Sequence, residues 1–555
     1  MRILRLLGVL ALIGLTAFAT YFYSRGGGEQ RDILSFIPTD FVYAIESDQP
    51  IQDWQNLSKS RVWRYLKETP YFSEISESAD YLDTLLIENK TVANFVKLGD
   101  LVISAHMVSK ENYDFIYLID LRKTNLGKMR EILGLLFKSF EYDVSVEKYF
   151  GIDIYELYDP EEQEILYLSI MDNILISSYD PDLIRKGIAQ SESPSIRNNE
   201  DFTFVREQTN RDELYTLYLN YSVFENLIAA FTSEIPESLQ GLDEIISFSS
   251  FDLEVKDDRT VFSGYMKQLD SVPSFLSVFK DVGKGRLHAQ NVLPAETALY
   301  TSIGFDEFID FYGRLENYYK AENPEEFESL NNSKERIEKL LKISFEDDFF
   351  SWMTDEVATA VVRIDTLREE YAYYALLHFD SYDKTKNSLD YVVERIQKTL
   401  ISPVKFTETD YKGFPIKYME LKGFFKLFFK KLFNNIEQPH YTYLDDYVVF
   451  SNDPASLQFL IDAYLSQNLL SRNDSYKKFI RNFDGQSNVY TYIQNEEFYP
   501  YFYETLDPES KKTFQGYESY LMSFPQVGLQ ISPSSGMYKT LLMAEFDPPA
   551  DHKEE

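Results

Sequence analysis

The 555-residue chain contains no cysteine. This absence excludes disulfides, thiolate metal sites, iron–sulfur clusters and cysteine nucleophiles. Histidine is also rare, and no two histidines stand at a metal-ligand spacing along the sequence. We therefore expect no bound metal and no other cofactor, and we interpret each histidine as an ordinary hydrogen-bonded residue. The five are His106, His288, His378, His440 and His552.

Positive charge is scarce, because 55 Lys and Arg face 90 Asp and Glu and give a formal net charge of −35 at pH 7. Proteins that bind nucleic acids neutralise phosphates with clustered Lys and Arg. The carboxylates here are spread along most of the chain, so we expect no nucleic-acid partner. The hydrophobic fraction of 44% and the aromatic fraction of 16% exclude a disordered chain, since such a chain can bury enough apolar surface to fold.

Sequence motifs of common enzymes are also missing. The run Gly283, Lys284, Gly285 completes neither a P-loop nor a dinucleotide fingerprint, and the chain has no HExxH or GxSxG element. Asp172 and Asp445 recur between pairs of expected strands, where turn formation is favoured over metal binding or proton transfer. We predict that the protein is not an enzyme and assign no catalytic, cofactor-binding or metal-binding residue.

The first 25 residues indicate where the protein is located. Arg2 and Arg5 precede an uncharged apolar run from Leu6 to Tyr23, which as a helix would be about 27 Å long and close to the hydrocarbon thickness of a thin bilayer. The positive-inside rule places the following residues outside the cytoplasm. We predict a cytoplasmic stub and transmembrane helix over 1–25, in a single-pass inner-membrane protein whose bulk lies in the periplasm.

A removable signal peptide is the alternative interpretation of this segment. Ala17, Phe18 and Ala19 fit a small-x-small cleavage site, and cleavage after Ala19 would release the protein into the periplasm. The aromatic cluster Tyr21–Tyr23, at the expected outer interface, and the flexible Gly26–Gly28 favour a retained anchor. Both interpretations place the folded chain outside the cytoplasm.

The rest of the chain contains one module twice. Short sequence features of the first half recur in the second half in the same order. The number of positions between matched residues grows slowly toward the C-terminal end. Asp180 stands directly before Pro181, and Asp453 stands directly before the matching Pro454. Both aspartates are expected to be helix N-caps. The matched pairs include Pro38 with Pro294, Asp100 with Asp355, Gly151 with Gly413, Pro181 with Pro454, and Tyr218 with Tyr492.

Short turns join most of the expected strands, whereas a parallel sheet would need regular helical crossovers. We therefore predict an α+β fold of two homologous modules with mainly antiparallel sheets and flanking helices, preceded by the one N-terminal transmembrane helix. The predicted parts after that helix are a linker over 26–34, module 1 over 35–280, a linker over 281–290, module 2 over 291–548, and a disordered tail over 549–555.

One basic segment interrupts the acidic chain between Leu421 and Ile436, where lysines alternate with phenylalanines and no acid occurs. A helix would gather three lysines on an arc of about 80° and apolar side chains elsewhere. Such a helix is a candidate for docking on anionic lipid or in a partner groove. Alternatively, its phenylalanines pack on the module's own sheet, and its lysines are solvated or paired with carboxylates. The candidate interaction residues are Lys422, Phe424, Phe425, Lys426, Phe428, Phe429, Lys430 and Leu432.

Several local features occur together: the apolar N-terminal segment, the run from Phe36 to Asp40, an amphipathic helix around Trp63, and a strand that starts at Gly99 and Asp100. With these features the chain resembles a bacterial family known only as a domain of unknown function. The resemblance implies a membrane-anchored envelope protein with a repeated α+β ectodomain. It implies no catalytic residue.

We therefore expect a non-enzymatic, membrane-anchored envelope protein that acts as a scaffold or interaction module. Its expected partners are the membrane, through the N-terminal helix, and an envelope protein or a lipid. A carrier or sensor of an apolar ligand is the alternative, because 42 Tyr and 43 Phe supply many amphipathic side chains for a cavity. A hydrolase with a dispersed site is the third hypothesis, which carboxylates with perturbed pKa values in one pocket would favour.

Overall fold

The computed structural model describes most of the chain, and the predicted N-terminal helix over 1–25 and the predicted tail over 549–555 lie outside it. None of the described helices is both long and apolar enough to cross a membrane. The described residues are 31–68, 99–110, 112–120, 143–160, 163–210, 213–226, 242–269, 274–365, 367, 370–399, 406–419, 424–430, 432–433, 435–437, 439–506 and 508–548.

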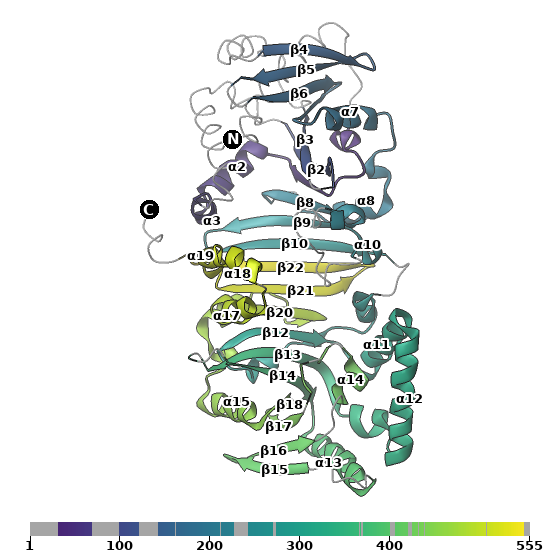
Figure 1. Ribbon diagram of the computed structural model, residues 1–555, viewed down its shortest axis with the longest axis vertical. Helices are drawn as coiled ribbons and strands as arrows, with labels where there is room; N and C mark the ends of the chain where they lie inside the picture. The colour runs from purple at the N-terminus through teal and green to yellow at the C-terminus, as the bar shows by residue number, and fades with distance from the viewer. Residues whose placement is uncertain are drawn as a thin grey trace. The chain divides into compact units, whose positions relative to one another are not determined.

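The chain divides into two compact units, Met1–Val272 (unit 1) and Pro273–Glu555 (unit 2) (Figure 1). The sequence analysis placed a linker over 281–290, but these residues pack inside unit 2, where Val282 and Leu287 are buried. Strand β11 (Gly285–Arg286) pairs there with β19 (Gln486–Ser487). A Cβ atom on Gly285 would lie 2.1 Å from a backbone oxygen, so this glycine permits close packing of the backbone.

Unit 1 contains an antiparallel sheet whose neighbouring strands follow the order β4-β5-β6-β7-β3-β2-β1-β8-β9-β10. Apolar residues recur along the inner strands and bury one or both of their faces, whereas Val146 of the edge strand β4 is 54% exposed. The strands are β1 (Tyr43–Ser47), β2 (Leu101–Met107), β3 (Tyr113–Asp120), β4 (Asp143–Tyr149), β5 (Ile152–Asp159), β6 (Glu164–Met171), β7 (Ile174–Ser178), β8 (Tyr215–Asn220), β9 (Ile246–Lys256) and β10 (Arg259–Gln268).

Unit 2 repeats this order as β15-β16-β17-β18-β14-β13-β12-β20-β21-β22. The predicted α+β class with antiparallel sheets is confirmed, and the shared strand order agrees with the repeat read from the sequence. The strands are β12 (Thr297–Gly304), β13 (Met353–Asp365), β14 (Glu370–Phe379), β15 (Phe406–Tyr411), β16 (Phe414–Met419), β17 (His440–Leu444), β18 (Tyr447–Ser451), β20 (Val489–Gln494), β21 (Gln526–Ser534) and β22 (Met537–Glu545).

Helices flank the strands in both units (Figure 1). The described α-helices of unit 1 are α2 (Pro50–Lys59), α3 (Arg61–Leu66), α7 (Pro181–Gln190), α8 (Glu200–Arg206) and α10 (Leu242–Ile245). Those of unit 2 are α11 (Phe308–Glu322), α12 (Pro324–Leu341), α13 (Tyr382–Thr399), α14 (Phe424–Phe429), α15 (Pro454–Ser466), α16 (Asp474–Ile480), α17 (Asn495–Thr505), α18 (Pro508–Gln515) and α19 (Glu518–Met522). Shorter turns are η1 (Ile33–Phe36), η3 (Ile196–Asn198), η4 (Tyr221–Val223), η6 (Phe275–Phe279), η7 (Ala289–Asn291), the π-helical η8 (Glu346–Phe350) and η9 (Leu470–Arg472).

Two local predictions from the repeat are confirmed. The Asp180 carboxylate accepts from two backbone N–H groups at the start of α7, and the Asp453 carboxylate accepts from one at the start of α15. Asp172 and Asp445 have φ angles of 55° and 51°, and each sits in the two-residue turn between strands, where a short polar residue tolerates left-handed backbone.

Candidate functional site

The helix expected over 421–436 is shorter in the structure. Helix α14 spans Phe424–Phe429, and Lys430 follows it with left-handed backbone at φ 42°. Phe425 and Phe428 are 1% exposed, and Phe429 is fully buried. These phenylalanines therefore form no surface for a lipid or a partner protein.

The rings of α14 pack against strands and turns of unit 2. The ring centroid of Phe425 lies 4.8 Å from that of Phe450 in β18, in an edge-to-face arrangement. The Phe428 ring meets Phe345, just before η8, at 4.7 Å. Such pairs add to the stabilisation from apolar burial. The alternative stated above, packing on the module's own sheet, is what the described residues show.

Lys430 is a structural residue as well. It is 6% exposed, and its Nζ lies 3.3 Å from Oε2 of Glu326 in α12 and 4.7 Å from the ring centroid of Tyr319 in α11. The lysine thus links the end of α14 to two helices by an ion pair and a cation–π contact. Leu432 is partly buried against the same core. Three candidate side chains lie outside the described part: those of Lys422, Phe424 and Lys426.

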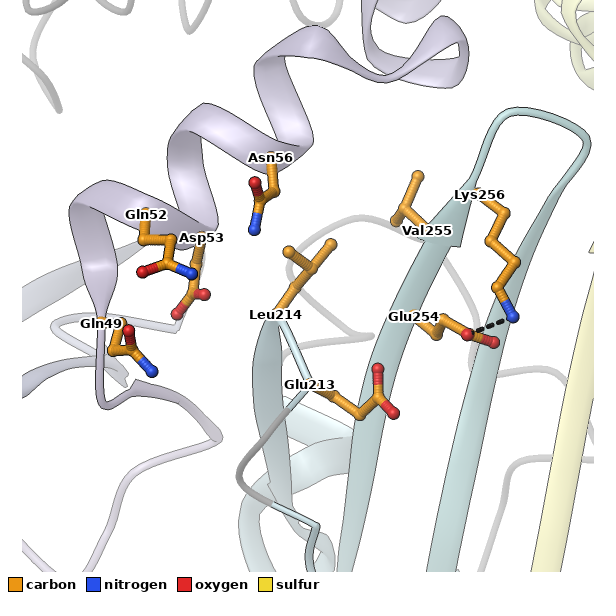
Figure 2. Close-up of a pocket in the computed structure, with 9 residues that line it drawn as sticks. All are labelled: Gln49, Gln52, Asp53, Asn56, Glu213, Leu214, Glu254, Val255 and Lys256. Atoms are coloured by element: carbon orange, nitrogen blue, oxygen red, sulfur yellow. Dashed lines mark ion pairs between the residues drawn. The ribbon is translucent and has the colours of Figure 1, made fainter.

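A polar pocket of about 330 Å³ opens in unit 1 beside α2 (Figure 2). The amide side chains of Gln52 and Asn56 line it from the helix, and Glu213 lines it from the segment before β8. Figure 2 shows Glu254 and Lys256 at the end of β9, across from α2, joined by an ion pair. Amides and carboxylates suit hydroxyl or amine groups, so this pocket does not favour an apolar ligand.

Asp53 is the least exposed carboxylate of this pocket. The hydroxyl of Ser47 donates a hydrogen bond to its Oδ2. Burial raises the pKa of Asp53, and the Ser47 hydrogen bond opposes that change. The pocket therefore joins one partly desolvated carboxyl to several exposed polar groups.

Within the described ranges, no group of three or more His, Asp and Glu side chains is arranged to hold a metal ion.

Glu46 forms a buried ion pair in the sheet of unit 1. Its carboxylate accepts from Nη2 of Arg206 at 2.7 Å, from Nε of the same guanidinium at 3.2 Å, and from the Tyr218 hydroxyl at 2.7 Å. Glu46 is 5% exposed. The planar fork of the guanidinium matches the two carboxylate oxygens, so the pair ties α8 to β1.

Replacing Arg206 by methionine is expected to lower the free energy of unfolding of unit 1 by about 3–5 kcal/mol, because the Glu46 charge stays buried without its cation. Urea denaturation monitored by hydrogen-exchange mass spectrometry would measure this loss in unit 1 peptides. The double variant Glu46→Gln with Arg206→Met is the control and should recover most of the loss. If the single variant matched the wild type, the ion pair would not hold α8.

Glu356 in β13 is a buried carboxylate of unit 2 and is 1% exposed. It accepts from the backbone N–H of His288 at 2.8 Å and from the hydroxyls of Ser302 and Tyr447. Burial raises the pKa of Glu356, and these hydrogen bonds oppose that change.

His378 lies next to this carboxylate network, at the end of β14. Its Nδ1 is 2.7 Å from Oδ1 of Asp355, and its Nε2 is 3.1 Å from Oδ2 of Asp446. Burial alone would lower the pKa of His378, but the interactions with Asp355 and Asp446 raise it to about 10. With this pKa the imidazole would be a cation at neutral pH, clamped between two carboxylates, and the Thr354 hydroxyl also lies 2.6 Å from Nδ1.

The position of unit 1 that matches His378 holds a different side chain, that of Asp120. The β14–β18 register places His378 opposite Tyr447, and the β3–β7 register places Asp120 opposite Ile174. In unit 1 the Asn173 amide donates to Oδ1 of Asp120 at 3.0 Å. Each unit thus links the ends of two neighbouring strands by a side-chain pair, and this pair is charged in unit 2.

Residues 108–395, just over half of the chain, match a family described as a protein of unknown function (DUF3352). The chain belongs to this family. The expected resemblance to a domain of unknown function is thereby confirmed. No curated protein matches the chain. The match reaches into both units of this DUF3352 protein.

Among solved structures, the DUF3352 chain is similar to TP0453. For crystal form III of TP0453 the TM-score is 0.25 at 12% identity, over 45% of this chain and 85% of TP0453. For crystal form IV the TM-score is 0.25 at 12% identity, over 43% and 81%. A similarity at this level supports no inference about fold or function.

The polar clusters of this DUF3352 protein were missed in the sequence. His378 was interpreted as an ordinary hydrogen-bonded residue, yet it has two carboxylate partners. A signal was available, because Asp355 and the Asp445-Asp446 turn both belong to the repeat. The pocket of Figure 2 has no such signal, since its residues come from three segments far apart in the chain.

Proposed function

We propose that this DUF3352 protein is a non-enzymatic, membrane-anchored envelope protein whose two units stand on the periplasmic side and serve as scaffold or interaction modules. The observation that carries the proposal is the uncharged apolar run Leu6–Tyr23, which follows Arg2 and Arg5. This run ends eight positions before Arg31, where the described fold of unit 1 begins. Positive charge just before an apolar span favours an orientation in which the following residues lie outside the cytoplasm.

The shared strand order of the two units supports an interaction role. Together with the matched sequence features, we attribute this order to duplication of one module. Two like modules present two related surfaces to an envelope protein or a lipid. The pocket of Figure 2 is polar and gives no support to a carrier of apolar ligands.

Membrane topology tests the proposal directly, because any cysteine introduced into this cysteine-free chain is its only thiol. Leu4→Cys precedes the apolar run, and Leu367→Cys replaces a residue of unit 2 that is 95% exposed. In spheroplasts, a membrane-impermeant maleimide should label Leu367→Cys at once. It should label Leu4→Cys only after the membrane is permeabilised.

The labelled protein should also stay with the membrane after an alkaline carbonate wash. Labelling of both cysteines only after permeabilisation would place the units in the cytoplasm and contradict the proposal. Recovery of a soluble periplasmic protein that starts at residue 20 would instead establish the cleaved signal peptide.

A further inference from the structure

The turn between β4 and β5 exposes an aromatic side chain. Phe150 is 84% exposed, and its φ of 47° is followed by a φ of 81° at Gly151. Two positive φ angles are typical of a type I′ hairpin turn, whose first position favours Asn, Asp or Gly. A bulky apolar residue there is unfavourable both for its backbone and for its solvation. The ring of Phe150 packs beside that of Tyr149, at 4.6 Å between centroids.

Unit 2 has the same turn with a polar tip. Lys412 and Gly413 join β15 to β16 with φ angles of 56° and 90°. The Nζ of Lys412 donates to Oδ1 of Asp462 at 2.6 Å, and the Tyr411 hydroxyl donates to the same carboxylate at 3.0 Å. The hairpin therefore folds with a charged residue at its tip, and its geometry alone does not explain Phe150.

The Phe150 turn lies at the same end of the unit 1 sheet as Arg31, the first described residue. In the β5–β6 register Ile154 pairs with Ser169, so the start of β5 lies beside the end of β6. The Phe150 turn and the β6–β7 turn, Asp172–Asn173, thus leave the sheet at the same end, about 10 Å apart at the usual strand spacing. Figure 1 shows β4, β5 and β6 side by side with α7 next to them.

Arg31 is fixed at this same end. Its Nε lies 2.8 Å from Oδ2 of Asp172, and its backbone N–H donates to Oδ1 of Asn173 at 2.8 Å. Its Nη1 also donates to the backbone oxygen of Ser191, just after α7, at 2.8 Å. The chain therefore enters unit 1 beside the Phe150 turn.

The tether between this point and the apolar segment is short. Arg31 follows Tyr23 by eight positions, which span at most about 28 Å when fully extended and about 16 Å on average for a glycine-rich coil. With Tyr21–Tyr23 at the outer membrane–water interface, this end of unit 1 is held close to the bilayer surface.

The charges beside the turn permit that approach. In this acidic protein, the carboxylate of Glu147 is paired with Arg185 at 2.7 Å, and that of Asp153 is paired with Lys148 at 3.3 Å. Each of the two acids that flank the hairpin tip therefore has a cation beside it, although Arg185 is shared with Asp182 at 3.1 Å. These pairs reduce the repulsion of the two acids from anionic headgroups.

We propose that the β4–β5 turn, with Phe150 at its tip, contacts the headgroup region of the bilayer that holds the N-terminal segment. Phenylalanine is one of the apolar residues that interfacial segments bury at the headgroup–acyl boundary, and the neighbouring Tyr149 is of a type enriched at membrane–water interfaces. The tether gives the turn a high local concentration at the surface, so one inserted aromatic side chain suffices for a contact that a free domain would not maintain. The inference rests on the proposed function, because an untethered unit 1 would lack this advantage.

The test uses the full-length chain with single cysteines, reconstituted into vesicles of phosphatidylethanolamine and phosphatidylglycerol. Phe150→Cys carries an environment-sensitive fluorophore, and the vesicles contain a lipid-attached quencher at headgroup depth. Lys110→Cys is the matched control, because it lies in the exposed β2–β3 turn at the opposite end of β3. We expect the emission at 150 to shift to shorter wavelength and to fall severalfold with the quencher, whereas emission at 110 stays nearly constant.

A third variant, Leu15→Cys, separates this inference from the proposed anchor. Quenching at 15 by a lipid-chain quencher, without quenching at 150, would overturn the membrane contact and leave the anchor intact. A label at 15 that no lipid quencher reaches would contradict the anchor and the contact together. Equal quenching at 150 and 110 would show nonspecific adsorption and would also overturn the proposal.

Discussion

Replacing Phe428 by alanine is expected to lower the free energy of unfolding of unit 2 by about 3–5 kcal/mol, through lost apolar burial and the cavity left behind. The Phe428 ring is 1% exposed and lies between Phe345 and Phe350, at 4.7 and 5.3 Å between centroids. Urea denaturation would measure the loss. Trp352 is a suitable fluorescent probe, because it is buried in the same core.

Phe150→Ala is the matched control for residue type. This side chain is 84% exposed, so its loss should change the free energy of unfolding by less than about 0.5 kcal/mol. A Phe428→Ala protein with wild-type stability would show that α14 lies on the surface. The interaction helix described from the sequence would then return as the better interpretation.

The sequence left two interpretations of α14 open for a physical reason. Helical periodicity tells which residues share a face, but it does not tell which face is covered. Here Lys430 also makes internal contacts, since its ammonium meets Glu326 and the ring of Tyr319. These partners stand more than 100 positions earlier in the chain, and only the tertiary fold brings them to α14.

More of the fold than of the site could be predicted from the sequence. The repeat, the antiparallel strands and the caps at Asp180 and Asp453 are local patterns, and each is visible in a short stretch of chain. The strand order is not local, because β3 pairs with β7 across the intervening β4–β6 hairpins. The packing of residues 281–290 is nonlocal as well, because Gly285 makes a close backbone contact that only the folded unit contains.

The polar sites depend entirely on such nonlocal pairing. Asp355 and Asp446 reach His378 from two different strand ends. Burial of Glu356 is set by the packing of neighbouring strands and η7, and its pKa shift follows from that burial. A sequence with 90 acidic residues offers too many carboxylate pairs to single these out.

Raising the pH from 6.5 to 10 is expected to destabilise unit 2 by roughly 2–4 kcal/mol through His378, with the effect reduced by partial solvent screening. The folded-state pKa of about 10 lies above the ordinary value of 6.5, so the folded unit binds the proton more tightly than the unfolded chain does. The stabilisation is therefore complete below pH 6.5 and is lost as the pH rises toward 10. Denaturant titrations at each pH, monitored by hydrogen exchange in unit 2 peptides, would measure it.

His378→Gln should be less stable than the wild type below pH 6.5, and the difference between the two proteins should disappear near pH 10. Other groups that titrate in this range contribute equally to both proteins, so the difference isolates the histidine. His106 in unit 1 provides a control of opposite sign. Burial lowers its pKa despite the hydrogen bond to Asp40, so its effect should be a loss of stability as the pH falls below 6.5. A pH-independent difference between wild type and His378→Gln would show that the imidazole is neutral, and the charged clamp between Asp355 and Asp446 would then be wrong.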